Sequence, residues 1–253
     1  MKYINIDKDT FNKLTERIFE MKTDESTIHP FMYKDKKKVF KLFKEGINID
    51  NKFEKIVLLN DRLKNIDFVV TAECIIKYNG KPIGYIMPYI DGEIFDSLSF
   101  RKKDNILILK DIAEKVKELH KLGIVCGDLI DNIMVDSNKN IYFIDIDNFL
   151  IDNLTINTKT ILLKEYEKQI QKFDYKFDYY ILNLLTLSII TKIDPNYLEL
   201  QYRINPERFN FKDEEINQIV RNTFNLKDVY EEELIVDKIT SNKDFKKIKT
   251  RFF

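Results

Sequence analysis

The sequence has little of what metal centres and disulfide-stabilised folds need. It contains two cysteines, two histidines and no tryptophan among 253 residues. Cys74 and Cys126 lie far apart, and neither belongs to a cluster with the spacing of zinc ligands. Neither a zinc site nor a disulfide framework is therefore expected.

An excess of one charge and long apolar runs are also missing. Lysine plus arginine equals aspartate plus glutamate at 42 each, which gives no electrostatic reason to expect nucleic acid or an anionic membrane as a partner. No uncharged stretch approaches the length of about 20 residues that spans a bilayer. No apolar run follows a basic start, as it would in a secretory signal. These absences predict a cytoplasmic protein, and 253 residues suffice for one large domain or two small lobes.

The most informative stretch begins at His120, in the last turn of a predicted helix, where the helix dipole favours it. Gly123 follows, as expected where a helix ends in a left-handed residue. The next residues form a short polar loop that carries Asp128 and Asn132. Cys126, in the same loop, has no evident basic partner and is interpreted as a buried structural thiol.

A β-hairpin is predicted directly after this loop. Two apolar strands, residues 133–135 and 141–144, flank a polar turn at residues 136–140. The second strand leads into Asp145 and Asp147. Carboxylate and amide oxygens are the ligands that hard cations such as magnesium prefer. Asp145 is therefore a candidate metal ligand, whereas Asp147 is either a further ligand or a solvated or helix-capping residue.

These motifs resemble the catalytic loop and metal-binding segment of the protein kinase-like superfamily. Cys126-Gly127-Asp128 is closer to the His-Gly-Asp loop of the aminoglycoside and choline kinase branch, or of bacterial kinases, than to His-Arg-Asp. Asn132 stands at the loop asparagine, although it follows Asp128 by four residues where the family pattern has five. Asp145-Ile146-Asp147 stands at the Asp-Phe-Gly position.

The resemblance covers roughly residues 38–190 and implies an α+β, bilobal fold. Residues 1–89 would form a small N-lobe with an antiparallel sheet that covers the nucleotide. Residues 90–253 would form a mainly helical C-lobe that carries the catalytic loop and the metal-binding hairpin. The implied cofactors are ATP and Mg²⁺.

A strand with alternating side chains is predicted at residues 38–43, and alternation places Val39 and Lys41 on one face. The segment resembles the kinase strand Val-Ala-Ile-Lys, which implies that Lys41 contacts the nucleotide phosphates and Val39 the adenine. An ordinary lysine-rich surface strand remains the alternative. The preceding polar stretch, residues 23–38, is where a kinase places its glycine-rich loop, yet it contains no glycine.

A helix is predicted at residues 51–63, where apolar residues recur at helical spacing. Glu54 lies beside the core-facing Phe53 and early in this helix. The resemblance implies that Glu54 forms an ion pair with Lys41 that holds the lysine on the phosphates. A solvated helix charge is the alternative.

A second hairpin is predicted at residues 68–89, turned at Asn79-Gly80. Its end resembles the hinge between kinase lobes, where backbone groups bind the adenine edge. The residues that this resemblance places along the adenine are Met87, Tyr89 and Ile90.

Helices are also predicted within residues 1–22, at residues 101–122 and over the apolar span 177–190. The resemblance implies that Asp178 bonds the backbone of the catalytic loop, whereas an N-cap of the last helix is the alternative. After residue 148 no glycine-rich or proline-marked activation segment is evident.

The resemblance predicts an ATP-dependent phosphotransferase that moves the γ-phosphate to a hydroxyl acceptor. Asp128 would act as the base, Asp145 and Asn132 would hold Mg²⁺, and Lys41 would neutralise phosphate charge. The acceptor, a protein Ser/Thr or a small molecule, stays open. Two alternatives remain: a nucleotide-binding pseudokinase or scaffold, suggested by the missing glycines and the short loop, and nucleotidyl transfer in the same pocket.

Overall fold

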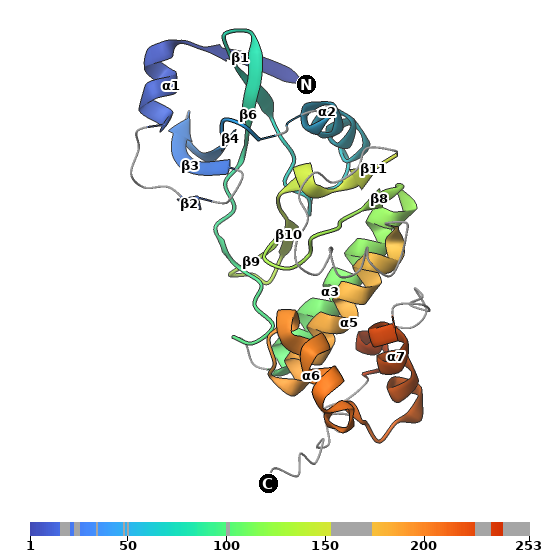
Figure 1. Ribbon diagram of the computed structural model, residues 1–253. Coiled ribbons are helices and arrows are strands. Elements are labelled where there is room, and N and C mark those ends of the chain that lie inside the picture. The colour runs from blue at the N-terminus through green and yellow to red at the C-terminus, as the bar shows by residue number, and fades with distance from the viewer. Residues whose placement is uncertain are drawn as a thin grey trace. The chain divides into compact units, whose positions relative to one another are not determined.

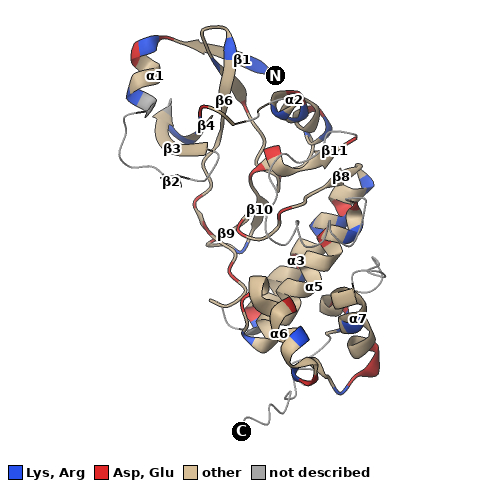
Figure 2. Ribbon diagram, in the orientation of Figure 1, with Lys and Arg blue, Asp and Glu red and all other residues tan. Residues whose placement is uncertain are grey.

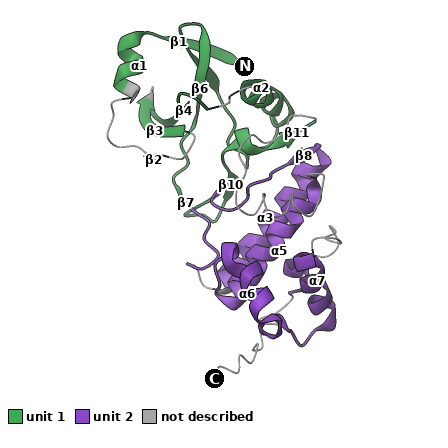
Figure 3. Ribbon diagram, in the orientation of Figure 1, with its two compact units in different colours: residues 1–93, 134–157 green, residues 94–133, 158–253 purple. Residues whose placement is uncertain are grey.

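The computed structural model describes residues 1–15, 21–22, 26–33, 35–47, 49, 51–99, 102–152, 174–225 and 234–239. The chain forms two compact units, which are described separately (Figure 3). The first contains Met1–Glu93 and Met134–Asn157, and the second contains Ile94–Ile133 and Thr158–Phe253. The hairpin predicted at residues 133–144, which was expected to belong to the lobe of residues 90–253, groups with the first unit from Met134 onward.

The first unit is built on a six-stranded sheet with the order β1-β5-β6-β4-β3-β2 (Figure 1). Its strands are β1 (Lys2–Ile6), β2 (Met21–Lys22), β3 (Ser26–Tyr33), β4 (Lys36–Phe43), β5 (Cys74–Tyr78) and β6 (Lys81–Pro88). All pairs are antiparallel except that of β1 with β5, which is parallel. The predicted α+β class is confirmed, but the sheet is mixed rather than purely antiparallel.

The β5–β6 hairpin turns at Asn79 and Gly80, as predicted. Both residues have positive φ, 50° and 77°, the combination that a two-residue turn matching the twist of its strands requires. The first strand begins at Cys74, because residues 68–70 instead pair with another strand of the unit.

The register of the sheet places the candidate nucleotide-binding residues on one face. Lys41 lies opposite Tyr85 and Val39 opposite Met87 on the paired strands β4 and β6. Directly opposed residues of an antiparallel pair share a face, so these four side chains point to the same side. The opposite face of the sheet carries a separate apolar cluster of Leu42, Cys74, Ile76 and Ile86.

Two helices and a small sheet complete the first unit. Helix α1 (Lys8–Thr15) agrees with the helix predicted within residues 1–22, and Phe11 stacks on Tyr78 with ring centroids 4.4 Å apart; residues 16–20 lie outside the described part. Helix α2 (Lys52–Arg62) is confirmed. The remaining elements are β7 (Gly92–Ile94), β9 (Ile133–Asp136) and β10 (Ile141–Phe143), paired in the order β10-β9-β7, followed by the 3₁₀ turn η1 (Ile146–Asn148) and β11 (Leu150–Ile151).

The second unit is mainly helical, as predicted. It contains α3 (Lys102–Lys121), β8 (Ile124–Val125), α5 (Tyr175–Thr191), η2 (Pro195–Tyr197), α6 (Leu198–Ile204), η3 (Pro206–Phe209), α7 (Glu214–Asn225) and α8 (Ile235–Lys238). Helices α3 and α5 pack side by side (Figure 1), and residues 177–189 of α5 are all buried. The predicted lack of an activation segment concerns residues that lie mostly outside the described part.

Acidic and basic residues occur on elements of both units (Figure 2). Of the helices that the structure describes, none combines the length and the apolar character needed to cross a membrane.

Candidate active site

The backbone of the first unit fixes where the chain turns after β10. Phe143 donates its N–H to the carbonyl of Phe68 and accepts from the N–H of Val70, both at 2.8 Å. Two residues later Asp145 adopts a left-handed conformation with φ of 65°. Its carbonyl accepts from the N–H of Asn148 at 3.0 Å, which closes η1. Strand pairing and this turn together hold the Asp145 side chain in place.

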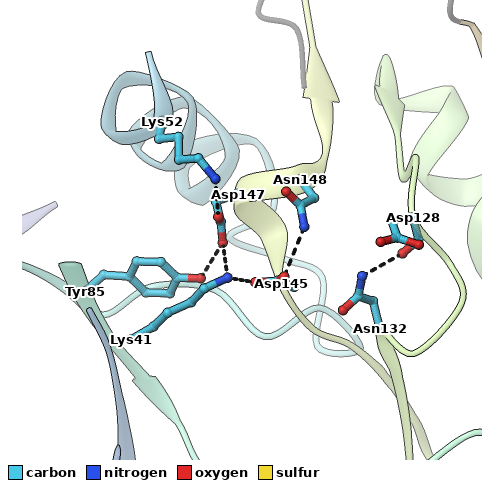
Figure 4. A network of polar contacts seen from close by, with 8 residues as sticks. All are labelled: Lys41, Lys52, Tyr85, Asp128, Asn132, Asp145, Asp147 and Asn148. Carbon is cyan, nitrogen blue, oxygen red and sulfur yellow. Dashed lines mark hydrogen bonds and ion pairs between the residues drawn. The ribbon is translucent and has the colours of Figure 1, made fainter. Parts of the chain in front are cut away.

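Lys41 of β4 meets the two aspartates that follow β10 (Figure 4). Its ammonium group forms ion pairs with Asp145 and with Oδ1 of Asp147, the latter at 2.8 Å. Lys41 is 4% exposed, so these contacts form away from bulk water. A side chain at Gly84 would collide with the carbonyl oxygen of Lys41, so glycine lets β6 approach β4 here. The structure thus brings together Lys41 and Asp145, which lie 104 positions apart.

Asp147 is buried and surrounded by donors. Its Oδ1 accepts from Lys41 and from the hydroxyl of Tyr85 at 2.8 Å, and its Oδ2 from the ammonium of Lys52 at 3.0 Å. Burial raises the pKa of Asp147, but the charges of Lys41 and Lys52 outweigh it, and the net pKa lies well below its ordinary value. Asp147 is therefore a fixed anion within the protein, not the solvated or helix-capping residue considered from the sequence.

The expected ion pair between Lys41 and Glu54 does not form among the described residues. Glu54 is exposed, and the carboxylates on Lys41 come from Asp145 and Asp147. Helix α2 buries a different set of side chains: Lys52, Lys55, Ile56 and Leu59. Because this buried face begins at Lys52, Glu54 lies on the opposite side of the helix, which corrects the expectation from the sequence.

Of the residues expected along the adenine, two lie on the paired strands β4 and β6 and two directly follow β6. Val39 and Met87 are buried, at 7% and 8% exposure, and share their face with Lys41. Tyr89 and Ile90 follow β6 and are half-buried. The N–H of Tyr89 donates to the carbonyl of Lys37 at 3.3 Å, and the Lys37 ammonium lies 3.5 Å from the Tyr89 ring centre.

In the second unit, Asp178 of α5 holds the loop that precedes Asp128. Its two carboxylate oxygens accept from the N–H groups of Cys126 and Gly127, both at 2.8 Å. The N-cap of α5 is Asp174, which accepts from the N–H of Lys176. Of the two roles considered for Asp178, the structure therefore shows the bond to the loop backbone.

The contacts of His120 and the burial of Cys126 indicate structural rather than chemical roles for both residues. The ring nitrogens of His120 lie 2.8 Å from the Tyr179 hydroxyl and 2.8 Å from Asp178 Oδ2, contacts that the helix-end position did not indicate. Cys126 is fully buried and unbridged. Burial, together with the charge of Asp178, raises the pKa of its thiol well above the ordinary value. The interpretation of Cys126 as an inert buried thiol is confirmed.

Asp128 and Asn132 lie in this loop. The side-chain amide of Asn132 donates to the carbonyl of Asp128 at 3.0 Å (Figure 4). Gly127, directly before Asp128, and Asp131, directly before Asn132, adopt left-handed conformations with φ of 79° and 65°. Burial, helped by the negative charge of Asp131, raises the pKa of Asp128 to about 7. A carboxyl with such a pKa can take up a proton near neutral pH.

The chemistry of these side chains fits a magnesium–nucleotide complex. Magnesium bound with a nucleotide takes one or two carboxylates and completes its shell with phosphate and water oxygens. Asp145 of the first unit, whose side chain is 24% exposed, offers oxygens of this type, and Asn132 of the second unit separately offers an amide oxygen. Within the described ranges no group of three or more His, Cys, Asp or Glu side chains forms a metal cage.

No protein-family model matches the sequence. The KEOPS complex subunit Bud32 of Pyrococcus abyssi (strain GE5 / Orsay) is 25% identical over 113 residues, which are 44% of this chain and 51% of the relative. The match thus spans about half the length of that relative. The solved structure of the Cydia pomonella granulovirus kinase PK-1 matches with a TM-score of 0.59 and 16% identity, over 90% of this chain and 98% of that chain. The chain has the fold of the protein kinase-like superfamily.

Proposed function

We propose that this chain, with its protein kinase-like fold, is an ATP-dependent phosphotransferase that moves the γ-phosphate of ATP to a hydroxyl group. The observation that carries the proposal is the meeting of a strand lysine, Lys41, with Asp145 at the end of a hairpin. Phosphoryl transfer is mostly positioning and charge stabilisation, and these two groups supply both needs.

The Lys41 ammonium carries the positive charge that a magnesium ion would bring to Asp145. The Asp145 carboxylate carries the negative charge that a phosphate would bring to Lys41. Asp145 would hold the magnesium ion of magnesium–ATP, and Lys41 would contact a phosphate oxygen and neutralise its charge. Asn132 is assigned as the second metal ligand. Val39, Met87, Tyr89 and Ile90 are assigned to the adenine side of the nucleotide.

Asp128 is assigned as the base that accepts the proton of the attacking hydroxyl. Its pKa of about 7 supports this role, because a base works best when its pKa lies near the working pH. Asp178 accepts hydrogen bonds from the backbone N–H groups of Cys126 and Gly127, the two residues directly before Asp128. In this assignment residues 1–89 cover the nucleotide, and residues 90–253 supply the catalytic loop and the hairpin.

The acceptor is a hydroxyl of a protein Ser/Thr or of a small molecule. The neighbourhood of Asp128 includes Asp131, whose pKa is raised by burial and by the negative charges of Asp194 and Asp96. This local negative charge favours neutral or cationic acceptors over anionic ones.

The test is incubation with γ-labelled ATP and Mg²⁺, followed by measurement of labelled phosphate, labelled acceptor and self-labelling. The proposal predicts transfer by the wild type and its loss in Asp145→Ala. Binding of magnesium–ATP without turnover, with both classes of acceptor supplied, would point to the scaffold alternative. A product heavier by AMP rather than by phosphate would point to nucleotidyl transfer.

A further inference from the structure

Helix α2 contributes Lys52 to the ion-pair network around Lys41, where Glu54 was expected. Lys52 is 1% exposed, and its ammonium nitrogen lies 3.0 Å from Oδ2 of Asp147. Glu54, two residues later, is exposed. A lysine is rarely buried to this degree without a partner of opposite charge, and Asp147 is such a partner.

Asp147 joins three elements through one carboxylate. Its donors are Lys41 from β4, Lys52 from α2 and Tyr85 from β6, at 2.8, 3.0 and 2.8 Å. Asp147 itself is 1% exposed, so these contacts form away from bulk solvent. A carboxylate held from three sides fixes in turn the ammonium of Lys41.

The charges of this network do not cancel as they would in a simple ion pair. Among the described contacts, Lys41 and Lys52 bring two positive charges to the single negative charge of Asp147, which lies two residues from Asp145. Without Lys52, Asp147 would neutralise Lys41. With Lys52 present, the positive charge of Lys41 stays available for an anion once Asp145 has turned to a metal.

We propose that Asp147 takes the place of the helix glutamate as the carboxylate that positions Lys41, and that Lys52 leaves Lys41 its net positive charge for the nucleotide phosphates. Asp147 and Lys52 are thus positioning residues that act through Lys41. The proposal rests on the proposed phosphotransferase function and specifies how its phosphate-binding lysine is held.

The first test is the affinity for magnesium–ATP, measured by calorimetry on the full chain. Lys52→Met keeps the length of the side chain but removes its charge. We expect the Kd to rise about tenfold, which is about 1.4 kcal/mol of binding free energy, because a positive charge that favours the phosphates is removed. An unchanged Kd overturns the proposal.

The second test separates charge from structure. Asp147→Asn alone lowers kcat about tenfold to a hundredfold, since Lys41 loses its anchor, without weakening magnesium–ATP binding. In the double variant Lys52→Met/Asp147→Asn, no carboxylate of residue 147 neutralises Lys41, so the Kd returns toward the wild-type value while kcat stays low. If the double variant has a higher Kd for magnesium–ATP than Lys52→Met, Lys52 affects binding only by stabilising the fold. That result overturns the proposal.

Lys55→Met is the matched control. Lys55 lies on the buried face of the same helix and is also 1% exposed, so the substitution costs stability in the same way. We expect its Kd for magnesium–ATP to equal that of the wild type. An increase equal to that of Lys52→Met would mean that loss of any buried lysine of α2 weakens binding, and would overturn the assignment.

The outcome for the wild type separates this inference from the proposed function. A wild type that neither binds magnesium–ATP nor transfers phosphate removes both. A wild type that binds and transfers, together with a Lys52→Met variant that matches it, removes the present inference alone.

Discussion

Asn148 donates its side-chain amide to Oδ2 of Asp145 at 3.0 Å, within the same 3₁₀ turn. Because a carboxylate can only accept, the amide nitrogen of Asn148 must face it. This bond fixes one oxygen of Asp145, and the other contacts Lys41. Asn148 therefore orients the carboxylate that is assigned to the metal.

Asn148→Ala tests this orientation. We expect the Mg²⁺ concentration for half-maximal activity to rise about tenfold, as when a partner that orients a metal ligand is removed. Asn140→Ala is the control, since it removes a similar amide–carboxylate bond, to Asp136 at 2.8 Å, in the exposed hairpin turn. Equal Mg²⁺ dependence in the two variants would contradict the role of Asn148.

Asp178→Asn tests the support of the catalytic loop. An amide group at this position would turn its NH₂ toward one of the two N–H donors of Cys126 and Gly127. We expect the free energy of unfolding to fall by about 1.5–3 kcal/mol, the range for a hydrogen bond to a charged group, together with a lower kcat.

The control for this substitution is Asp174→Asn on the same helix. Asp174 is the N-cap of α5, where asparagine and aspartate serve about equally well. Denaturant unfolding of both variants measures the difference. An Asp178→Asn protein as stable as the wild type would show that the two backbone bonds contribute little.

The raised pKa of Asp128 predicts a pH dependence. Asp128 accepts a proton only when deprotonated, so kcat/KM is expected to fall as the pH drops through about 7. Asp131→Asn removes the negative charge that helps to raise this pKa, and the acidic limb should move to lower pH.

Asp111→Asn provides the comparison for the pH profile. Asp111 is exposed on α3 and pairs with Lys115, and it does not contribute to the raised pKa of Asp128. Its profile should match that of the wild type. If Asp131→Asn leaves the acidic limb in place, the limb belongs to another group.

The contact between Lys41 and Asp145 could be anticipated from the sequence because local patterns carried it. Alternation fixed the face of Lys41 on its strand, and the turn at residues 136–140 fixed the hairpin that leads to Asp145. Strand β1 was missed because it is short and its residues are almost all exposed at the sheet edge.

Lys52 was missed, and the burial of Asp147 was not predicted, because charge predicts exposure better than it predicts burial. The signal for Lys52 was nevertheless present: it precedes the buried Ile56 by four residues and Leu59 by seven, the spacing of one helix face. The apolar pattern drew attention to Phe53, which is only half-buried, and so to Glu54. No local pattern could show that Asp147 has two lysines and a tyrosine around it.

The most direct test of the central claim compares wild type with Asp128→Asn, measuring both magnesium–ATP affinity and transfer of labelled γ-phosphate. The account predicts unchanged affinity and a turnover lowered roughly a hundred- to ten-thousandfold, the range for loss of a general base. Full turnover in Asp128→Asn would contradict it.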